Sequence, residues 1–254
     1  GPFGVTHLAG GTWVSEGGAL AQGWERCDDG HYRVCIDGIP QYTGAIVDSD
    51  GYVYYINSST KASVQDQIYY VTKSNGLVPN GYYTMDEQGR LMDGRGNYVK
   101  ADTAMEDGLK FFADDSVVYY ENGARKVYAG LIEFEGAYYY INDNAKPIAG
   151  KTYYITRTNG LAFSDGTPIP KGTYSFDNEG RMILKNGLVD GVYYENNAPK
   201  ANIGVICQDG KYYYIAANGK PVTGRRYFVT KTNGLVLKGW YHFDVNGVMI
   251  QTVV

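Results

Sequence analysis

The feature that most constrains the fold of this chain is internal repetition. The string YYVTKSNGL that begins at Tyr69 returns as YYITRTNGL at Tyr153 and as YFVTKTNGL at Tyr227. Self-similarity over a long period is the signature of an array in which each unit packs against its neighbours. In such an array a residue type recurs first of all because every unit packs in the same way. Recurrence alone is therefore no evidence that a residue is catalytic or binds a ligand.

Shorter units lie within these long ones. GLIEFEGAYYYINDNAKPIAGK from Gly130 matches GVICQDGKYYYIAANGKPVTGR from Gly204, and looser copies begin at Gly44 and Gly23. The shared pattern is a Gly, an apolar residue, a few mixed residues, a second Gly, an aromatic-rich run and a polar turn. It returns roughly every twenty residues, so about ten units would fill the chain.

Each short unit predicts a β-hairpin. The runs are rich in aromatic and β-branched residues, which suit a pleated, half-buried surface. Asp-Gly and Asn-Gly pairs lie between them, and these pairs accept the positive φ of tight turns; the 34 glycines of the chain fit such frequent turns. No window keeps a 3.6-residue apolar period. The sequence therefore predicts an all-β fold, a β-solenoid of about ten stacked β-hairpin repeats with almost no helix.

The repeats occupy residues 23–254, whereas residues 1–22 fit the pattern poorly. Two possibilities stay open for this segment. It forms an N-terminal cap that shields the first repeat, as arrays require for solubility, or it is the remnant of an upstream domain. The apolar residues available for a cap are Phe3, Val5, Leu8, Trp13 and Val14.

Composition and motifs exclude several functions. A net charge of -4 with scattered lysines provides no basic stripe for a nucleic-acid backbone. No apolar run is long enough for membrane insertion. The three histidines stand in no known catalytic motif, and no Gly-rich loop precedes a helix. We therefore expect a chain that is not an enzyme and that needs no cofactor.

The acidic turns and the cysteines receive structural interpretations. Turns such as Asp48-Ser49-Asp50 lack the Glu that closes a calcium loop, so we expect turn chemistry and no metal site. Cys27 and Cys207 precede Asp-Gly pairs at equivalent places and are expected to be small apolar fillers. A disulfide between Cys27 and Cys35 is the alternative for the first hairpin.

The short units resemble the cell-wall-binding and choline-binding repeats of Gram-positive bacteria, and more closely the repeats of clostridial toxins and of glucan-binding domains. The units at Gly130 and Gly204 carry the resemblance best, and looser copies extend it from Gly23 onward. The resemblance implies a non-catalytic attachment module of a secreted or cell-surface bacterial protein. It also implies a β-solenoid of stacked hairpins.

The chain departs from the choline-binding pattern in its tryptophans. Choline-binding repeats hold a quaternary ammonium between aromatic rings, with a Trp after the first Gly. Trp24 and Trp240 occupy that place here, but Leu131 and Val205 stand there in the best copies, and the chain has three tryptophans in all. The leucine-type pattern resembles repeats whose ligands are carbohydrates.

Aromatic rings are the expected ligand contacts, because a sugar offers an apolar face of C–H bonds flanked by hydroxyls. The candidates are the rings near the start of each run and two tryptophans, namely Tyr138, Tyr153, Tyr212, Tyr227, Trp240 and Trp24. The competing interpretation is that these rings pack between repeats, since most tyrosines of such an array do so. Weak sites repeated along the chain would gain affinity by multivalency.

Three hypotheses remain for function. The first is binding of carbohydrate, whether a cell-wall polymer, a glucan or a host glycan. The second is an adhesin that binds a host protein, since tyrosine is also a favoured anchor of protein interfaces. The third is a structural spacer without a ligand.

Among the repeated segments, the three strings around TKSNGL are the most similar to one another. Each has a Thr followed by a basic residue and then an Asn-Gly pair, at Thr72, Thr156 and Thr230. The identity indicates either a repeated binding feature or a turn in which Asn-Gly needs positive φ. We favour the turn.

Overall fold

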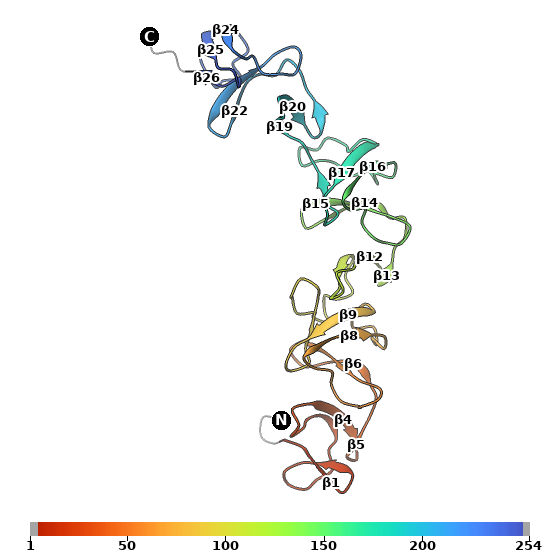
Figure 1. Ribbon diagram of the computed structural model, residues 1–254. Helices are drawn as coiled ribbons and strands as arrows, with labels where there is room; N and C mark the ends of the chain where they lie inside the picture. Colours follow the sequence, from red (N-terminus) through yellow and green to blue (C-terminus); the bar gives the residue numbers. More distant parts are fainter. Residues whose placement is uncertain (1–4, 251–254) are drawn as a thin grey trace. The chain divides into compact units, whose positions relative to one another are not determined.

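The computed structural model describes residues 5–250, and these form strands, turns and irregular segments with no helix. The strands make ten separate antiparallel sheets of two or three strands, seen as successive pairs of arrows in Figure 1. No helix long and apolar enough to cross a membrane is found in this range. The predicted all-β fold of hairpin repeats with almost no helix is confirmed.

One N-terminal hairpin precedes three groups of hairpins. The N-terminal hairpin consists of β1 (His7–Ala9) and β2 (Thr12–Val14). The first group contains β3 (Gly23–Arg26), β4 (Tyr32–Ile36), β5 (Ile39–Pro40), β6 (Gly44–Val47), β7 (Val53–Ile56), β8 (Gln67–Val71), β9 (Gly81–Met85) and β10 (Leu91–Met92). The second contains β11 (Gly108–Phe111), β12 (Val117–Glu121), β13 (Ala124–Arg125), β14 (Gly130–Phe134), β15 (Ala137–Ile141), β16 (Lys151–Ile155), β17 (Gly172–Phe176) and β18 (Met182–Ile183). The third contains β19 (Gly187–Val189), β20 (Val192–Glu195), β21 (Ala198–Pro199), β22 (Gly204–Gln208), β23 (Lys211–Ile215), β24 (Arg225–Val229), β25 (Gly239–Phe243) and β26 (Met249–Ile250).

The chain folds into two compact units. The first contains residues 5–161 and 170–181, and the second contains residues 162–169 and 182–250. The N-terminal hairpin and the first two groups up to β17 belong to the first unit. The third group belongs to the second unit.

Alternation along the strands supplies the core of each unit. In β9, Tyr83 and Met85 are buried while Tyr82 is exposed, as a period of two predicts. β15 departs from alternation, because Tyr139, Tyr140 and Ile141 are all buried. Tyr139 packs into a core cluster within the first unit, and the ring of Tyr140 meets a ring of β16 on the opposite side. Both faces of this hairpin are therefore covered, which a sequence period cannot indicate.

The N-terminal hairpin packs on the first repeat. Trp13 and Ala21 form a buried cluster with Cys27 and Cys35, and the backbone N–H of Thr6 donates to the carbonyl of Arg26 at 2.9 Å. The N-terminal hairpin thus covers buried side chains of the first repeat. Val5 and Leu8, also expected in a cap, are exposed, and Phe3 lies outside the described residues.

The prediction of a small apolar filler is confirmed for Cys27 and wrong for Cys207. All three cysteines are free thiols, and Cys27 and Cys35 are buried. Cys27 is the expected apolar filler, and burial raises the pKa of its thiol. The same expectation for Cys207 is wrong, because Cys207 is exposed. Cys27 follows β3 beneath the N-terminal hairpin, whereas Cys207 lies within β22 opposite Tyr212.

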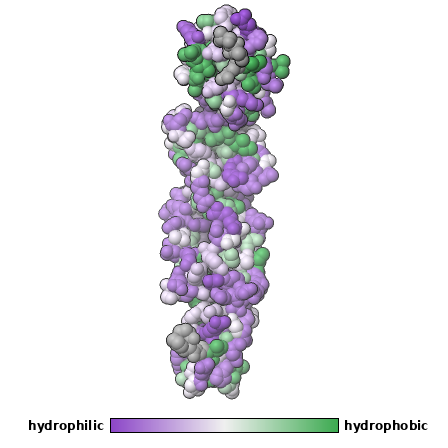
Figure 2. Space-filling model, turned by 90° about the vertical axis from the view of Figure 1, so that its left-hand side faces the viewer, coloured by the Kyte–Doolittle hydropathy of each residue, from purple (hydrophilic) through white to green (hydrophobic). Residues whose placement is uncertain are grey.

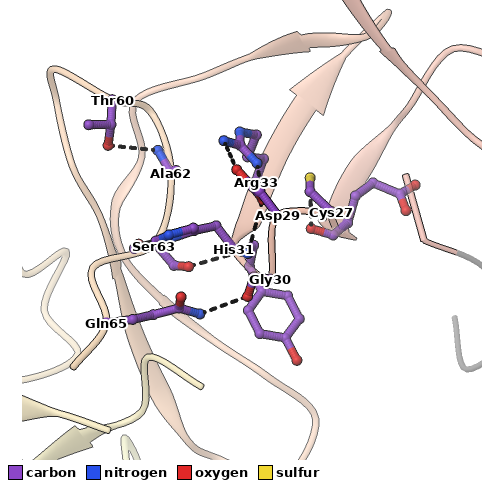
Figure 3. A network of polar contacts seen from close by, with 11 residues as sticks. Cys27, Asp29, Gly30, His31, Arg33, Thr60, Ala62, Ser63 and Gln65 are labelled. Atoms are coloured by element: carbon purple, nitrogen blue, oxygen red, sulfur yellow. Dashed lines mark hydrogen bonds and ion pairs between the residues drawn. The ribbon is translucent and has the colours of Figure 1, made fainter. Parts of the chain in front are cut away.

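Polar contacts join the first repeat to the loop that follows β7. Ser63 is buried; its hydroxyl accepts the backbone N–H of Tyr32 at 2.9 Å, and its carbonyl oxygen lies 2.8 Å from Nδ1 of His31. Gln65 donates to the carbonyl of Gly30 at 3.0 Å (Figure 3). Hydrogen bonds thus supplement ring packing between successive hairpins, and His31 has a structural role there.

The acidic turns are held by their own carboxylates. Oδ1 of Asp48 accepts the backbone N–H groups of Asp50 and Tyr52 at 2.9 and 3.0 Å. Asp86 and Asp177 accept from the residues two and four positions further on in the same way. The prediction of turn chemistry is confirmed. In residues 5–250 no group of His, Cys, Asp and Glu side chains suited to a metal ion is found.

Candidate functional site

A cleft lies between hairpin β14–β15 and strand β16 in the first unit. Its volume is about 600 Å³, and we call it the Tyr128 cleft. Its lining includes three tyrosines, two basic side chains and a threonine, namely Tyr128, Tyr140, Tyr153, Lys151, Arg157 and Thr156. Aromatic walls with a few polar groups are typical of sites for small ligands.

Backbone contacts fix one wall of the Tyr128 cleft. The N–H of Leu131 donates to the carbonyl of Arg157 at 2.9 Å. Gly130 makes this approach possible, because its φ is +75° and a Cβ at this position would lie 2.7 Å from the Arg157 carbonyl oxygen. Only glycine combines positive φ with such a close approach of two backbones.

Asn159 ties the same loop to β14. Its side-chain amide donates to the carbonyls of Ala129 and Leu131 at 2.7 and 2.9 Å. Asn75 and Asn233 make the equivalent pairs of bonds in the other two groups. The repeated Asn therefore joins successive hairpins, which explains why the string around it is well kept.

The turn interpretation of the TKSNGL strings is confirmed, with one correction. Asn159 and Gly160 both have positive φ, of 54° and 69°. The expectation that the Asn-Gly pair forms the tight turn of its hairpin is wrong, because β16 ends at Ile155 and β17 begins at Gly172. The Asn-Gly turn lies inside a long connection, and the Thr and basic residue before it line the cleft.

Asn159→Gly is expected to lower the free energy of unfolding of the first unit by about 1–2 kcal/mol, because it removes two side-chain hydrogen bonds and keeps positive φ accessible. Asn122→Gly is the matched control. Asn122 has nearly the same φ, of 53°, and no hydrogen bond of its side chain is seen in residues 5–250. Urea denaturation of both variants measures the difference. Equal losses in the two variants would contradict a joining role for Asn159.

Tyr140 forms the floor of the Tyr128 cleft. Its side chain is 9% exposed, its ring centroid lies 5.6 Å from that of Tyr153, and its hydroxyl oxygen accepts the backbone N–H of Arg157 at 3.3 Å. Burial alone would raise the pKa of Tyr140, but the hydrogen bonds from Thr156 and Arg157 outweigh burial and lower it. The contact with the Tyr153 ring and the hydrogen bonds to the hydroxyl thus hold the Tyr140 side chain in position.

Tyr128 stands at the mouth of the cleft in an unusual conformation. Its φ is 55°, and its side chain is 63% exposed. A bulky residue in the left-handed region costs about 1 kcal/mol or more. Because the ring is exposed, its burial offsets little of this conformational cost. The stability of the fold therefore does not explain why this residue is a tyrosine.

A second cleft repeats the arrangement one group earlier, also in the first unit. It has a volume of about 390 Å³ and is lined by Tyr42, Tyr55, Tyr69 and Thr72 among others. The hydroxyl of Tyr55 lies 3.3 Å from that of Tyr42 and 3.2 Å from Oγ1 of Thr72. Nζ of Lys73 lies 4.6 Å from the centre of the Tyr42 ring. We call this the Tyr42 cleft.

The third group, in the second unit, keeps the frame with one substitution. The rings of Tyr214 and Tyr227 are 4.9 Å apart. Asn202 takes the place of Tyr128, with a φ of 56°, and Nζ of Lys231 donates to its carbonyl at 2.7 Å. Asparagine tolerates this conformation far better than tyrosine does. The backbone geometry at this position therefore does not depend on an aromatic side chain.

A second kind of aromatic surface lies on the outer face of the long hairpins. Trp240 is 57% exposed and meets Phe228 across β24–β25, with ring centroids 5.4 Å apart. Tyr70 and Tyr82 form the equivalent pair on β8–β9, at 4.9 Å, and there the pair also lines the Tyr42 cleft. Elsewhere, the face seen in Figure 2 carries hydrophobic residues as separate patches among hydrophilic ones.

The six candidate residues from the sequence fall into four environments. Tyr153 lines the Tyr128 cleft, and Tyr227 takes the equivalent place in the third group. Trp240 belongs to the outer aromatic surface. Trp24 is half-buried and stacks on Tyr32 at 4.7 Å, which fits a packing role. Tyr138 and Tyr212 are half-buried. They lie opposite Glu133 and Cys207, respectively, on the neighbouring strand of their hairpins.

Sequence reasoning missed Tyr128 and Tyr140, together with Tyr42 and Tyr55 in the first group. The sequence does contain a signal for Tyr42 and Tyr128, because both stand two residues before the Gly that opens a short unit. Tyr140 is the third ring of its run, and its role depends on β16 packing across it.

No protein-family model matches the chain, and no curated protein matches it. Among solved structures it is similar to the choline-binding domain of CbpL from Streptococcus pneumoniae, with 14% identity, a TM-score of 0.36 and 98% of each chain covered. It is also similar to the modular autolysin LytC from Streptococcus pneumoniae, with 13% identity, a TM-score of 0.32, and 98% of this chain and 53% of LytC covered. A third is alternansucrase in complex with isomaltononaose, with 19% identity, a TM-score of 0.30, and 98% of this chain and 15% of alternansucrase covered. The chain thus spans about half of LytC and a small part of alternansucrase.

Proposed function

We propose that the chain is a non-catalytic binding module of a secreted or surface bacterial protein, and that it attaches to a carbohydrate polymer through its aromatic clefts. The polymer is a cell-wall polymer, a glucan or a host glycan. The observation that carries the proposal is Tyr128, an exposed aromatic residue held at a positive φ of 55°. Strained residues of this kind cluster at functional sites.

The chemistry of the Tyr128 cleft suits a sugar. The rings of Tyr140 and Tyr153 are tilted by 41°, and with Tyr128 they offer flat apolar surfaces to the C–H face of a pyranose. Arg157 keeps unused N–H donors beyond those it gives to Tyr128 and Asn159, and Thr156 offers a hydroxyl. Aromatic surface with a few directional polar groups gives both affinity and orientation.

Repetition would strengthen attachment. The Tyr42 and Tyr128 clefts have the same plan, so a polymer chain or a polymer-coated surface could occupy both. Millimolar contacts linked in this way reach far lower apparent dissociation constants. The same reasoning makes a small monosaccharide a weak ligand.

The test is a glycan array of the purified chain, with a pull-down from host serum and epithelial lysate beside it. We expect saturable binding to one oligosaccharide series that strengthens with chain length, and no cleavage of the bound sugar. A blank array with one host protein captured specifically would replace the proposal with an adhesin. A blank result in both would leave a spacer.

A further inference from the structure

We infer that the Tyr128 cleft and the equivalent aromatic frame of the third group select anionic carbohydrate, a polymer that carries carboxylate or phosphate groups, over neutral sugar. This inference rests on the proposed function and adds the charge of the ligand. Basic side chains lie beside the aromatic rings in both groups.

Two basic residues border the Tyr128 cleft. Lys151 and Tyr153 are two positions apart on β16 and so share a strand face, with Nζ of Lys151 5.5 Å from the ring centre of Tyr153. Arg157 also lines this cleft. Asp143 is the one acidic residue of the lining, so the cleft has an excess of positive charge.

The third group keeps this pair of charges in the same register. Arg225 and Tyr227 repeat the positions of Lys151 and Tyr153, and Cζ of Arg225 lies 5.3 Å from the ring centre of Tyr227. Lys231 repeats Arg157. Ala217 stands where Asp143 stands in the second group, so the third group lacks that acidic residue.

The first group differs at one of the two positions. Lys73 repeats Arg157, but Gln67 replaces Lys151 and is preceded by Asp66. Nζ of Lys73 already lies against the Tyr42 ring. The Tyr42 cleft is therefore nearly neutral, and the chain contains its own uncharged version of the site.

The basic residues are not used up by ion pairs. None of the salt bridges within residues 5–250 involves Lys151, Arg157, Arg225 or Lys231. The whole chain has a net charge of -4, so these positive sites occur against an acidic background. A positively bordered aromatic cleft also repels a quaternary ammonium and attracts a carboxylate or a phosphodiester.

The experiment compares ligands that differ only in charge. Isothermal titration calorimetry measures binding of the chain to polygalacturonate and to its methyl ester, and to phosphorylated mannan and unmodified mannan. We expect the charged member of at least one pair to bind roughly tenfold more tightly. The difference is expected to shrink as salt rises from about 0.05 to 0.5 M, since salt screens exposed charges. The two pairs distinguish carboxylate from phosphate.

Lys151→Gln supplies the variant, because glutamine is the native residue at the equivalent position of the first group. It is expected to fold normally and to lose roughly threefold of the affinity for the charged ligand while binding the neutral one unchanged. Lys126→Gln, away from the cleft lining, is the control and is expected to change neither. Equal binding of charged and neutral members would overturn this inference and leave the proposed function standing. Failure of every sugar on the array and in the titrations would overturn both.

Discussion

Gly130→Ala is expected to destabilise the first unit by about 3 kcal/mol or more. The substitution has two costs. An alanine at a φ of +75° is strained by about 1 kcal/mol. Its Cβ would also lie 2.7 Å from the Arg157 carbonyl oxygen, and relief of that contact requires the loss of the Leu131 and Asn159 hydrogen bonds that join the two hairpins.

The same hairpin provides the matched control. Gly136, in the turn between β14 and β15, has a φ of +79°, and a Cβ there would meet nothing within 4 Å. Gly136→Ala should therefore cost only the conformational strain, about 1 kcal/mol. Urea denaturation of both variants isolates the effect of the close approach. Equal destabilisation would show that Arg157 does not need to lie against Gly130.

Tyr42→Asn combined with Tyr128→Asn is expected to weaken carbohydrate binding in the first unit while the chain stays folded. At Tyr128, asparagine suits the positive φ, and the native Asn202 occupies the equivalent position. The substitutions remove the exposed ring of Tyr128 and the half-buried ring of Tyr42, and they leave Tyr55 and Tyr140 in place. We expect the affinity of each altered cleft to fall at least about tenfold, while the melting temperature falls only slightly, because Tyr42 loses its contacts with Tyr55 and Lys73.

Two further variants separate this effect from a general loss of aromatic surface. Trp240→Ala removes a ring of the outer aromatic surface that lines neither cleft, and it is expected to leave binding unchanged. Asn202→Tyr should add an aromatic ring beside Tyr214 and Tyr227 in the third group and increase binding there. If the double asparagine variant binds as well as the original chain while Trp240→Ala does not, the outer surface is the site and the clefts are packing features.

Sequence reasoning reached the fold because local signals and global architecture agree in this chain. Asp209 and Gly210 at positive φ form the turn between β22 and β23, as an Asp-Gly pair predicts. The candidate site follows from the sequence only in part. Of the rings near the start of each run, Tyr153 lines the Tyr128 cleft and Tyr227 takes the equivalent place in the third group, whereas Tyr138 and Tyr212 lie elsewhere.

The missing information is how successive hairpins pack. Both Tyr139 and Tyr140 are buried because β15 is covered on each side, so alternation does not identify which ring faces a ligand. Tyr128 lies outside any strand, and its importance depends on a backbone angle that the residue type disfavours. Arg157 is a second example. Its backbone carbonyl accepts a hydrogen bond from Leu131 in β14, while its side chain lines the Tyr128 cleft.

Isothermal titration calorimetry can show whether the aromatic clefts bind carbohydrate. The ligand is the oligosaccharide that binds best on the array, and the two proteins are the original chain and the Tyr42→Asn, Tyr128→Asn variant. We expect saturable binding by the original chain and a loss of at least about tenfold in affinity, with fewer occupied sites, in a variant that remains folded. Unchanged affinity and stoichiometry in the folded variant would contradict this expectation.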